Sequence, residues 1–406
     1  MARTLAALPE GSRITDYVSL GVITKTFPLE RVRAALAATG KASVRERDLP
    51  AHVVVYYAIA LALYMQSSYR EVLRCLLEGL QWLMDPALTP RVAGHSGISQ
   101  ARTRLGWEPL RQLHDELIKP IAVAATQGAW YRQWRLVSLD GSTMEVADER
   151  DNETAFGRPG ANRGSSAYPQ FRFVSLVESG THVLFGTRMG PYATGENTLA
   201  REVLGALDGT MLCLADRGFF GFALWQQALA TGAQLLWRSR KNMRLACEQR
   251  LADGSYLSCL YPSERDRRHR SGSIRVRVIE YRLEGVADAE PIYRLVTSLL
   301  EPQQAPAQEL AALYHERWEI ETALDELKTH LRGARIILRS KTPDLVRQEF
   351  YGLLLAHFAV RALMHEAALK ANVDPDRLSF LHAVRVVRRK LSAFNAIPPS
   401  AKEEVP

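Results

Sequence analysis

Short apolar runs bounded by Gly, Asp or other polar residues mark the middle of the chain, and each has the length of a β-strand. The sequence predicts strands at 136–140, 171–177, 182–188, 211–215 and 234–237, with a hairpin turn between the second and the third. Three more runs, at 254–261, 273–283 and 292–299, predict a β-rich segment that follows them. The polar stretch 150–170 is expected to be a long loop, which is either functional or a disordered insertion.

Apolar residues at helical spacing dominate both ends of the chain. The first 130 residues are expected to be all-helical, with helices at 28–39, 50–66 and 69–82 and a further helix that begins at Ser99. Residues 53–65 are uncharged and too few to cross a bilayer, so that helix is expected to be buried. Near the C-terminus, the sequence predicts a long apolar core helix at 345–363 and a basic helix at 384–390.

One predicted helix, at 314–328, carries charged side chains along one edge. No Gly or Pro interrupts it, and at about 100° per residue the following four residues share a narrow stripe: Tyr314, Arg317, Glu321 and Lys328. A second stripe beside it is expected to face the core, and it consists of Leu313, Ile320, Leu324, Leu327 and Leu331. A carboxylate between two cations can hold a divalent metal while the cations bind phosphate oxygens. The same pattern also suits a solvated helix face with i,i+4 charge pairs.

The same helical geometry ranks the other acids of this helix. Glu319 and Glu326 lie roughly 160° and 140° from Glu321, so both are expected to be replaceable. Asp325 lies only about 40° from Glu321 and is therefore the serious competitor for its role.

Two further acids are expected at the ends of apolar strands. Asp140 closes the run that begins at Arg135 and precedes a Gly, and Asp216 closes the run 211–215. Arg217 and a Gly follow Asp216, and a helix is expected at 222–230. Acids at the carboxyl ends of strands lie where α/β sheets bind their ligands. Taken alone, each could equally mark a turn or a local ion pair.

The charged helix has the spacing Y-x(2)-R-x(3)-E-x(6)-K, which matches position for position the signature of the insertion-element-4 family of DDE transposases. The segments around Asp140 and Asp216 resemble those that carry the family's two catalytic aspartates. The resemblance covers most of the chain and is strongest at 136–143, 211–221 and 306–350.

This resemblance implies a fold class, α/β within a multi-domain α+β chain, built on a ribonuclease-H-like core. The expected domains are a helical N-terminal DNA-binding domain at 1–130, the catalytic core at 131–240 and 300–370, a β-rich insertion at 241–299, and a basic C-terminal helix and tail at 371–406. In the first domain, residues 96–105 with Arg102 and Arg104 are the expected DNA-recognition element, unless the helices only brace the core.

The resemblance also implies the site. Asp140, Asp216 and Glu321 would be the catalytic residues and would hold two Mg²⁺ ions, for which Mn²⁺ can substitute. Residues expected to bind DNA phosphates are Tyr314, Arg317, Lys328, Arg217, Arg339 and Lys341, with Arg335 beside the last two. The partners implied are double-stranded DNA, both as terminal inverted repeats and as target, and a second copy of the chain in a homodimer.

Composition agrees with a protein that binds polyanions. The chain has 52 Lys and Arg against 44 Asp and Glu, a net charge of +8. Many of the arginines fall in the β-rich segment, where a basic strand face suits either DNA phosphates or a charged edge strand: Arg238, Arg240, Lys241, Arg244, Arg265, Arg267, Arg268, Arg270, Arg275 and Arg277. The four cysteines lack CxxC spacing and are expected to be reduced thiols that form no zinc site, in a cytoplasmic, nucleoid-associated protein.

The activity expected is metal-dependent cleavage and strand transfer of insertion-sequence ends. One alternative is a ribonuclease-H-like nuclease or resolvase without strand transfer. The other is an inactive, truncated DNA-binding relic, because relatives commonly carry a further basic tail where this chain ends in Ala-Lys-Glu-Glu-Val-Pro.

Overall fold

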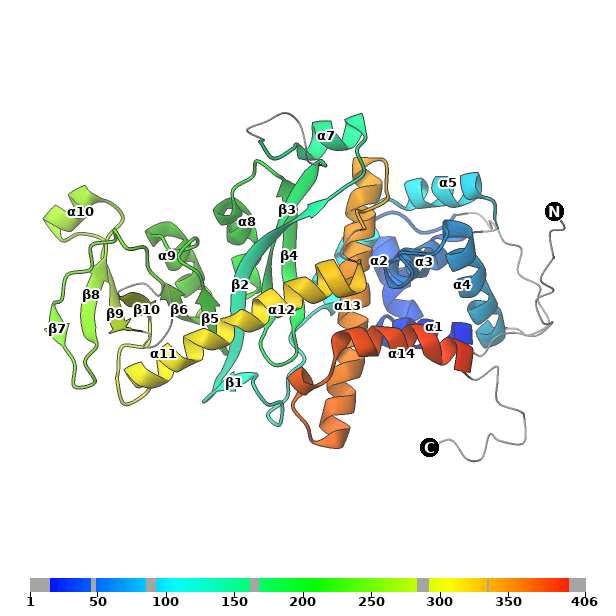
Figure 1. Ribbon diagram of the computed structural model, residues 1–406. Helices are drawn as coiled ribbons and strands as arrows, with labels where there is room; N and C mark the ends of the chain where they lie inside the picture. The colour runs from blue at the N-terminus through cyan, green and yellow to red at the C-terminus, as the bar shows by residue number, and fades with distance from the viewer. Residues whose placement is uncertain are drawn as a thin grey trace.

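A mixed β-sheet of ten strands forms the centre of the molecule (Figure 1). The computed structural model describes residues 15–44, 49–84, 93–160, 168–282, 292–333 and 336–393. The strands are β1 (Trp130–Tyr131), β2 (Trp134–Glu145), β3 (Gln170–Glu178), β4 (Val183–Pro191), β5 (Met211–Ala215), β6 (Gln234–Arg238), β7 (Gln249–Arg250), β8 (Tyr256–Leu260), β9 (Ile274–Tyr281) and β10 (Tyr293–Thr297). All eight strands predicted from apolar runs are confirmed, and β5 has the predicted bounds.

The strand order is β4-β3-β2-β5-β6-β10-β9-β8-β7, with β1 paired to β2. Strand β5 runs parallel to both of its neighbours, β2 and β6, and the other pairs are antiparallel. The β-rich segment is therefore a continuation of the central sheet, because β10 pairs directly with β6.

Six helices precede the sheet: α1 (Thr15–Thr26), α2 (Leu29–Ala38), α3 (Ala51–Leu63), α4 (Tyr69–Met84), α5 (His95–Leu105) and α6 (Glu108–Leu117). Helix α3 is buried along its length, as its apolar sequence predicts. In Figure 1 helices α1 to α5 lie on the far side of the long helix α13 (Pro343–Ala371) from the sheet. Helix α6 packs on both α13 and strand β4, and α13 also packs on α3. Helix α13 is long and apolar enough to cross a membrane, but 72% of its most apolar window is buried inside the protein, as in a core helix.

Shorter helices complete the described chain: α7 (Arg150–Phe156), α8 (Glu196–Val203), α9 (Phe222–Ala230), α10 (Glu264–His269) and α14 (Phe380–Ala393), with the 3₁₀ turns η1 (Leu204–Ala206) and η4 (Pro375–Arg377). Helix α9 has the predicted bounds. The expected loop 150–170 begins with α7, so the prediction of a loop is wrong there, and residues 161–167 lie outside the described residues.

The predicted helix at 314–328 is a helical run of four segments, not one regular α-helix. It consists of α11 (Ala307–His315), the 3₁₀ turn η2 (Glu316–Trp318), α12 (Glu319–Asp325) and the π-helical segment η3 (Glu326–Leu331). Figure 1 shows α11 and α12 crossing one face of the sheet diagonally toward α13. The apolar stripe predicted for this run does face the core. The wider turn of a π-helix, however, shifts the residues after Asp325 away from the positions that a 100° wheel gives them.

Glu326 points away from Glu321, as the sequence predicts, and its side chain is buried in the core. That it is replaceable without loss of cleavage stays a prediction. Its carboxylate accepts a hydrogen bond from Arg361 Nε at 2.8 Å and lies 3.1 Å from His182 Nδ1 and 3.3 Å from His357 Nε2. Burial alone would raise the pKa of Glu326, but hydrogen bonds from the two histidines and the charge of Arg361 hold that pKa well below its usual range. This cluster fixes the rotation of the run about its axis.

Replacing Glu326 by Gln is expected to lower the free energy of unfolding by about 3–5 kcal/mol, because the guanidinium of Arg361 would remain buried without its counterion. Urea unfolding followed by circular dichroism measures the effect. The control is Asp325→Asn, at the exposed neighbouring acid, which should stay within about 0.5 kcal/mol of wild type. Equal, small effects for both variants would contradict a stabilising role for Glu326.

Candidate active site

Asp140 and Asp216 lie side by side because β2 and β5 run parallel in register. The last parallel pair joins Leu139 to Ala215, and the two acids are the next residues of the two strands. The Asp-Gly dipeptide predicts that the strand ends at Asp140, and this prediction is wrong. Strand β2 continues to Glu145, and Asp140 pairs with Ser175 of β3. The acid sits instead where β2 loses its second neighbour, since β5 ends at Ala215 and leaves the edge beyond it open.

The helical run brings Glu321 to the same place. Arg317, on the 3₁₀ turn, lies 3.4 Å from Asp140 Oδ2 and 3.5 Å from Glu321 Oε1, so one guanidinium joins the strand acid to the helix acid. Tyr314 lies beneath Arg317, with its ring centre 5.9 Å from the guanidinium carbon and its hydroxyl donating to the carbonyl of Ala215 at 3.3 Å. Glu321 is 47% exposed, whereas Tyr314 is 7% exposed and packs in the core.

The site has the electrostatics of a cation-binding centre. Burial, together with the nearby carboxylates of Glu196 and Asp216, raises the pKa of Asp140 to about 6 against the opposing effects of its bond from Gly141 and of Arg317. Burial would lower the pKa of Arg317, but Tyr314 and the three acids around it raise that pKa. The raised pKa of Asp140 shows that its negative charge is disfavoured here, and a bound cation would favour that charge.

The donor set fits a divalent metal, since three carboxylates are the hard oxygen ligands that Mg²⁺ prefers. Among the described residues, the oxygens of these three acids are not all within 4.8 Å of one another. A different group of side chains meets that criterion. Arg317 explains the spacing, because it holds oxygens of both Asp140 and Glu321 and so occupies the position of a cation between them.

Lys328 reaches the same region from the π-helical segment. Its Nζ donates to Ser142 Oγ at 2.8 Å, two residues beyond Asp140 on β2. Burial and the charge of Arg332 lower the pKa of Lys328, so a bound anion nearby would favour its charged form. Arg217 is exposed directly after Asp216, whose Oδ1 accepts from the Arg217 backbone N–H at 2.5 Å. The structure therefore brings together the three acids, Tyr314, Arg317, Lys328 and Arg217.

Several predicted contact residues lie elsewhere. Arg339 donates to the carbonyl of Ser67 at 2.8 Å and stacks over the ring of Tyr69, and Lys341 pairs with Glu149 at 2.8 Å. Both therefore have protein partners away from the acids. Arg335 lies outside the described residues.

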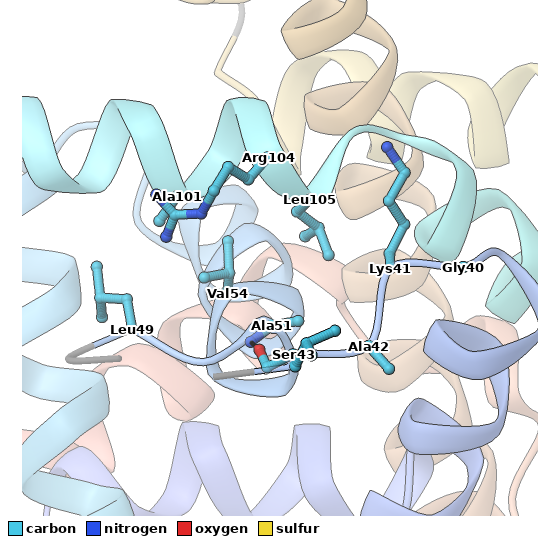
Figure 2. Close-up of a pocket in the computed structure, with 11 residues that line it drawn as sticks. Gly40, Lys41, Ala42, Ser43, Leu49, Ala51, Val54, Ala101, Arg104 and Leu105 are labelled. Carbon is cyan, nitrogen blue, oxygen red and sulfur yellow. Dashed lines mark hydrogen bonds between the residues drawn. The ribbon is translucent and has the colours of Figure 1, made fainter. Parts of the chain in front are cut away.

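The expected recognition element 96–105 corresponds to α5, but Arg102 on it faces inward. Its guanidinium donates to Gln348 at 2.8 Å and to Ser340 at 3.1 Å, so this arginine braces α13 and is not available to a DNA groove. Arg104 instead lines a cavity of about 340 Å³ between α5 and the segment after α2 (Figure 2). Lys41 and Ser43 share this lining with Leu49, Val54 and Leu105, and it includes none of the predicted catalytic residues.

The β-rich segment divides its arginines between two uses. A cavity of about 1100 Å³ beside β8 and α10 has a cationic lining that includes Lys241, Arg244, Arg267, Arg270 and Arg294. Arg277 is fully buried instead, where it pairs with Asp253 and donates to the carbonyl of Ala305 at 2.6 Å. For Arg277 the expected phosphate contact is wrong, because the side chain fills the core beneath the strand.

Two residues of the site carry no sequence signal that singles them out. Glu196, at the start of α8, is a fourth acid whose charge reaches Asp140, and it pairs with Arg172 at 2.6 Å. Trp318 follows Arg317 and is 62% exposed, so its indole ring is open to a stacking partner. The sequence alone does not show that Trp318 is exposed, because its exposure depends on how the helical run packs on the sheet.

Comparison with known proteins identifies relatives over nearly the whole chain. Residues 17–115 match the family model described as insertion element 4 transposase N-terminal, and residues 133–359 match the one described as transposase DDE domain. Transposase InsG for insertion sequence element IS4, from Escherichia coli (strain K12), is 29% identical over 380 residues, which cover 93% of this chain and 84% of the relative. Putative transposase InsZ of the same organism is 22% identical over 203 residues, covering 50% of this chain and 65% of the relative.

One solved structure, the cryo-EM structure of piggyBac transposase synaptic complex with hairpin DNA, aligns with 95% of this chain and 83% of that chain. The sequence identity is 12% and the TM-score is 0.47.

Proposed function

The chain belongs to the insertion-element-4 family of DDE transposases and is an enzyme of DNA transposition, and on this premise we propose how its residues do the work. DDE transposases generally use divalent metal ions, and their partner is DNA. We propose that Asp140, Asp216 and Glu321 are the catalytic residues and hold two Mg²⁺ ions. When bound, the two ions would activate the attacking water or 3′ hydroxyl and stabilise the leaving oxygen.

The observation that carries this proposal is the position of Arg317. Its guanidinium lies within 3.5 Å of oxygens of both Asp140 and Glu321, so a positive charge already sits between the strand acid and the helix acid. A DNA phosphate that enters the site would offer the guanidinium a bidentate partner. Arg317 would then turn toward the phosphate and leave the carboxylate oxygens to the metal. We therefore expect DNA binding to favour metal binding.

The neighbours of the acids would hold the DNA near the scissile bond. Lys328 and Arg217 would bind phosphate oxygens, and the exposed ring of Trp318 would stack on a base. Tyr314 supports the site from below, since its hydroxyl donates to the backbone next to Asp216. The cationic cavity of the β-rich segment would bind the phosphates of the duplex farther from the cleavage point.

The strand order supports a ribonuclease-H-like core. Taking β2, β3, β4, β5 and β6 in chain order as first to fifth, their order in the sheet is third, second, first, fourth, fifth, and the second strand is antiparallel to the first. The proposed domains keep the bounds predicted from the sequence. The active unit would be a homodimer in a nucleoid-associated complex that cleaves and joins inverted-repeat ends to target DNA. Joining of cleaved ends would separate this activity from that of a nuclease or resolvase.

Replacing Asp140, Asp216 or Glu321 by Ala is expected to lower cleavage of a transposon-end duplex by at least about a hundred-fold, because each removes a ligand from a centre that stabilises the transition state by several kcal/mol. Duplex binding should persist. Cleavage is measured on labelled duplex in Mg²⁺, and binding by fluorescence anisotropy.

The matched control is Asp325→Ala, one turn beyond Glu321. Asp325 is half exposed and pairs with His330 at 3.3 Å, so its removal should leave cleavage nearly unchanged. Cleavage that survives Glu321→Ala but not Asp325→Ala would transfer the role of third ligand to Asp325.

Lys328→Ala is expected to weaken end binding and to reduce the slope of log affinity against log salt by about 0.9, the value for one lost phosphate contact. Arg317→Lys should lose cleavage, because the ammonium cannot make the bidentate contact. Anisotropy titrations at several salt concentrations measure the slope, with Lys370→Ala, at an exposed residue near the end of α13, as the control. An unchanged slope for Lys328→Ala would mean that Lys328 makes no contact with the DNA backbone.

A further inference from the structure

A second group of metal-ligating side chains lies behind the helical run, separate from the three acids. It combines His182, the last residue of the β3–β4 turn, with Glu319 at the start of α12 and Asp376 in η4. One ligand atom from each lies within 4.8 Å of the other two. His182 Nε2 is 3.1 Å from Asp376 Oδ1 and 3.9 Å from Glu319 Oε2. Three segments that are distant in the sequence therefore meet at one point.

The imidazole of His182 is oriented as it is in a metal centre. Its side chain is only 4% exposed, and its Nδ1 lies 3.1 Å from Glu326 Oε1 and also contacts Arg361 Nη2. With a metal on Nε2, the proton would sit on Nδ1 and that N–H would donate to Glu326. Its Nε2 makes no aligned hydrogen bond within the described residues, and it points between the carboxylates of Glu319 and Asp376. Histidines that ligate metals commonly donate their other N–H to a carboxylate in this way, which fixes the tautomer and the ring.

The charges around the imidazole also leave room for a cation. Glu319, Glu326 and Asp376 contribute three negative charges, and the buried guanidinium of Arg361 contributes one positive charge. Glu319 Oε2 also accepts a hydrogen bond from the backbone N–H of Gly180 at 2.6 Å. The acids named here outnumber the one buried guanidinium, which suits a bound cation. Asp376 is 32% exposed, so the group is open to solvent on one side, where an ion can enter.

We propose that His182, Glu319 and Asp376 bind one divalent transition-metal ion, for which Zn²⁺ is the best match. One nitrogen and two oxygen donors suit Zn²⁺, whereas Mg²⁺ prefers oxygen ligands alone. This site differs from the proposed catalytic centre both in its ligands and in the face of α12 on which it lies. The bound ion joins the β3–β4 hairpin to α12 and to the segment after α13, so it is a structural site that positions the helix carrying Glu321.

The rival occupant of this space is a proton. Burial disfavours charge on His182, but Asp376 and Glu326 outweigh burial and raise its pKa to about 9, so a metal-free group would be an ion pair centred on an imidazolium. A metal titration distinguishes a group that binds an ion from a group that holds a proton on His182.

The test uses the full chain, stripped with a chelator and titrated with Zn²⁺ in excess Mg²⁺, which occupies carboxylate-only sites. Wild type should take up one tightly held Zn²⁺ per chain, and Co²⁺ in its place should give visible d–d absorption. Asp376→Asn should lower Zn²⁺ affinity by at least about a hundred-fold, and Glu326→Gln, which removes the partner of Nδ1, by about 10- to 100-fold. Asp344→Asn, at an exposed acid that pairs with Arg347, should bind like wild type.

Thermal unfolding gives a second readout that does not depend on activity. Zn²⁺ should raise the unfolding temperature of wild type and of Glu321→Ala, but not that of Asp376→Asn. Because Glu321→Ala lacks a proposed catalytic ligand, this arm separates the new site from the catalytic one. Equal Zn²⁺ uptake and equal thermal shifts in wild type and Asp376→Asn would overturn the proposal and leave the group as an ion pair around protonated His182.

Discussion

The buried contact between Glu326 and Arg361 determines how the rest of the site is arranged. A carboxylate removed from water loses hydration worth several kcal/mol, and it is tolerated only where its partners are placed to compensate. Glu326 meets Arg361 and His357 of α13 and His182 of the β3–β4 turn, and these partners can be reached in one rotation of the helical run. With that rotation fixed, Arg317 and Glu321 can only face the ends of β2 and β5. The surface geometry of the acids thus depends on a charge on the other face of the same run.

The charged contacts on the face of the run that carries Arg317 and Glu321 are weaker than those around Glu326. There the partly buried carboxylate of Asp140 and the more exposed one of Glu321 share Arg317, whose contacts of 3.4 and 3.5 Å are long for hydrogen bonds to a guanidinium. Such contacts are easy to exchange, whereas the cluster around Glu326 is not. One helix can therefore hold a rigid core contact and an exchangeable site together, which is what a centre that must accept both metal and DNA requires.

The sequence predicts the scaffold well and the charged residues unevenly. Apolar runs locate the strands, since burial of a strand leaves a direct mark on its composition. The candidate acids are predicted from strand ends and from spacing on the helix, and the structure brings them to one region although Asp140 lies within β2. The roles of arginines are harder to predict from the sequence. Arg102 and Arg277 lie in segments expected to contact DNA, yet both are buried and bound to Gln348 and Asp253. The helical wheel correctly places Glu326 away from Glu321, but nothing in the sequence indicates that this acid is buried against Arg361.

The pairing of β10 with β6 has a consequence for the proposed path of DNA. If residues 241–299 formed a separate domain on a linker, the cationic cavity near β8 could take any position relative to the acids. Because β10, β9 and β8 continue the central sheet by direct strand pairing, that cavity is fixed in register with β5 and β6, and Asp216 directly follows β5. Hydrogen-bonded strands resist shear, so a duplex held in the cavity would meet the acids at a fixed distance. The place of cleavage would then be set by the sheet, with the helical run supplying only the final ligand.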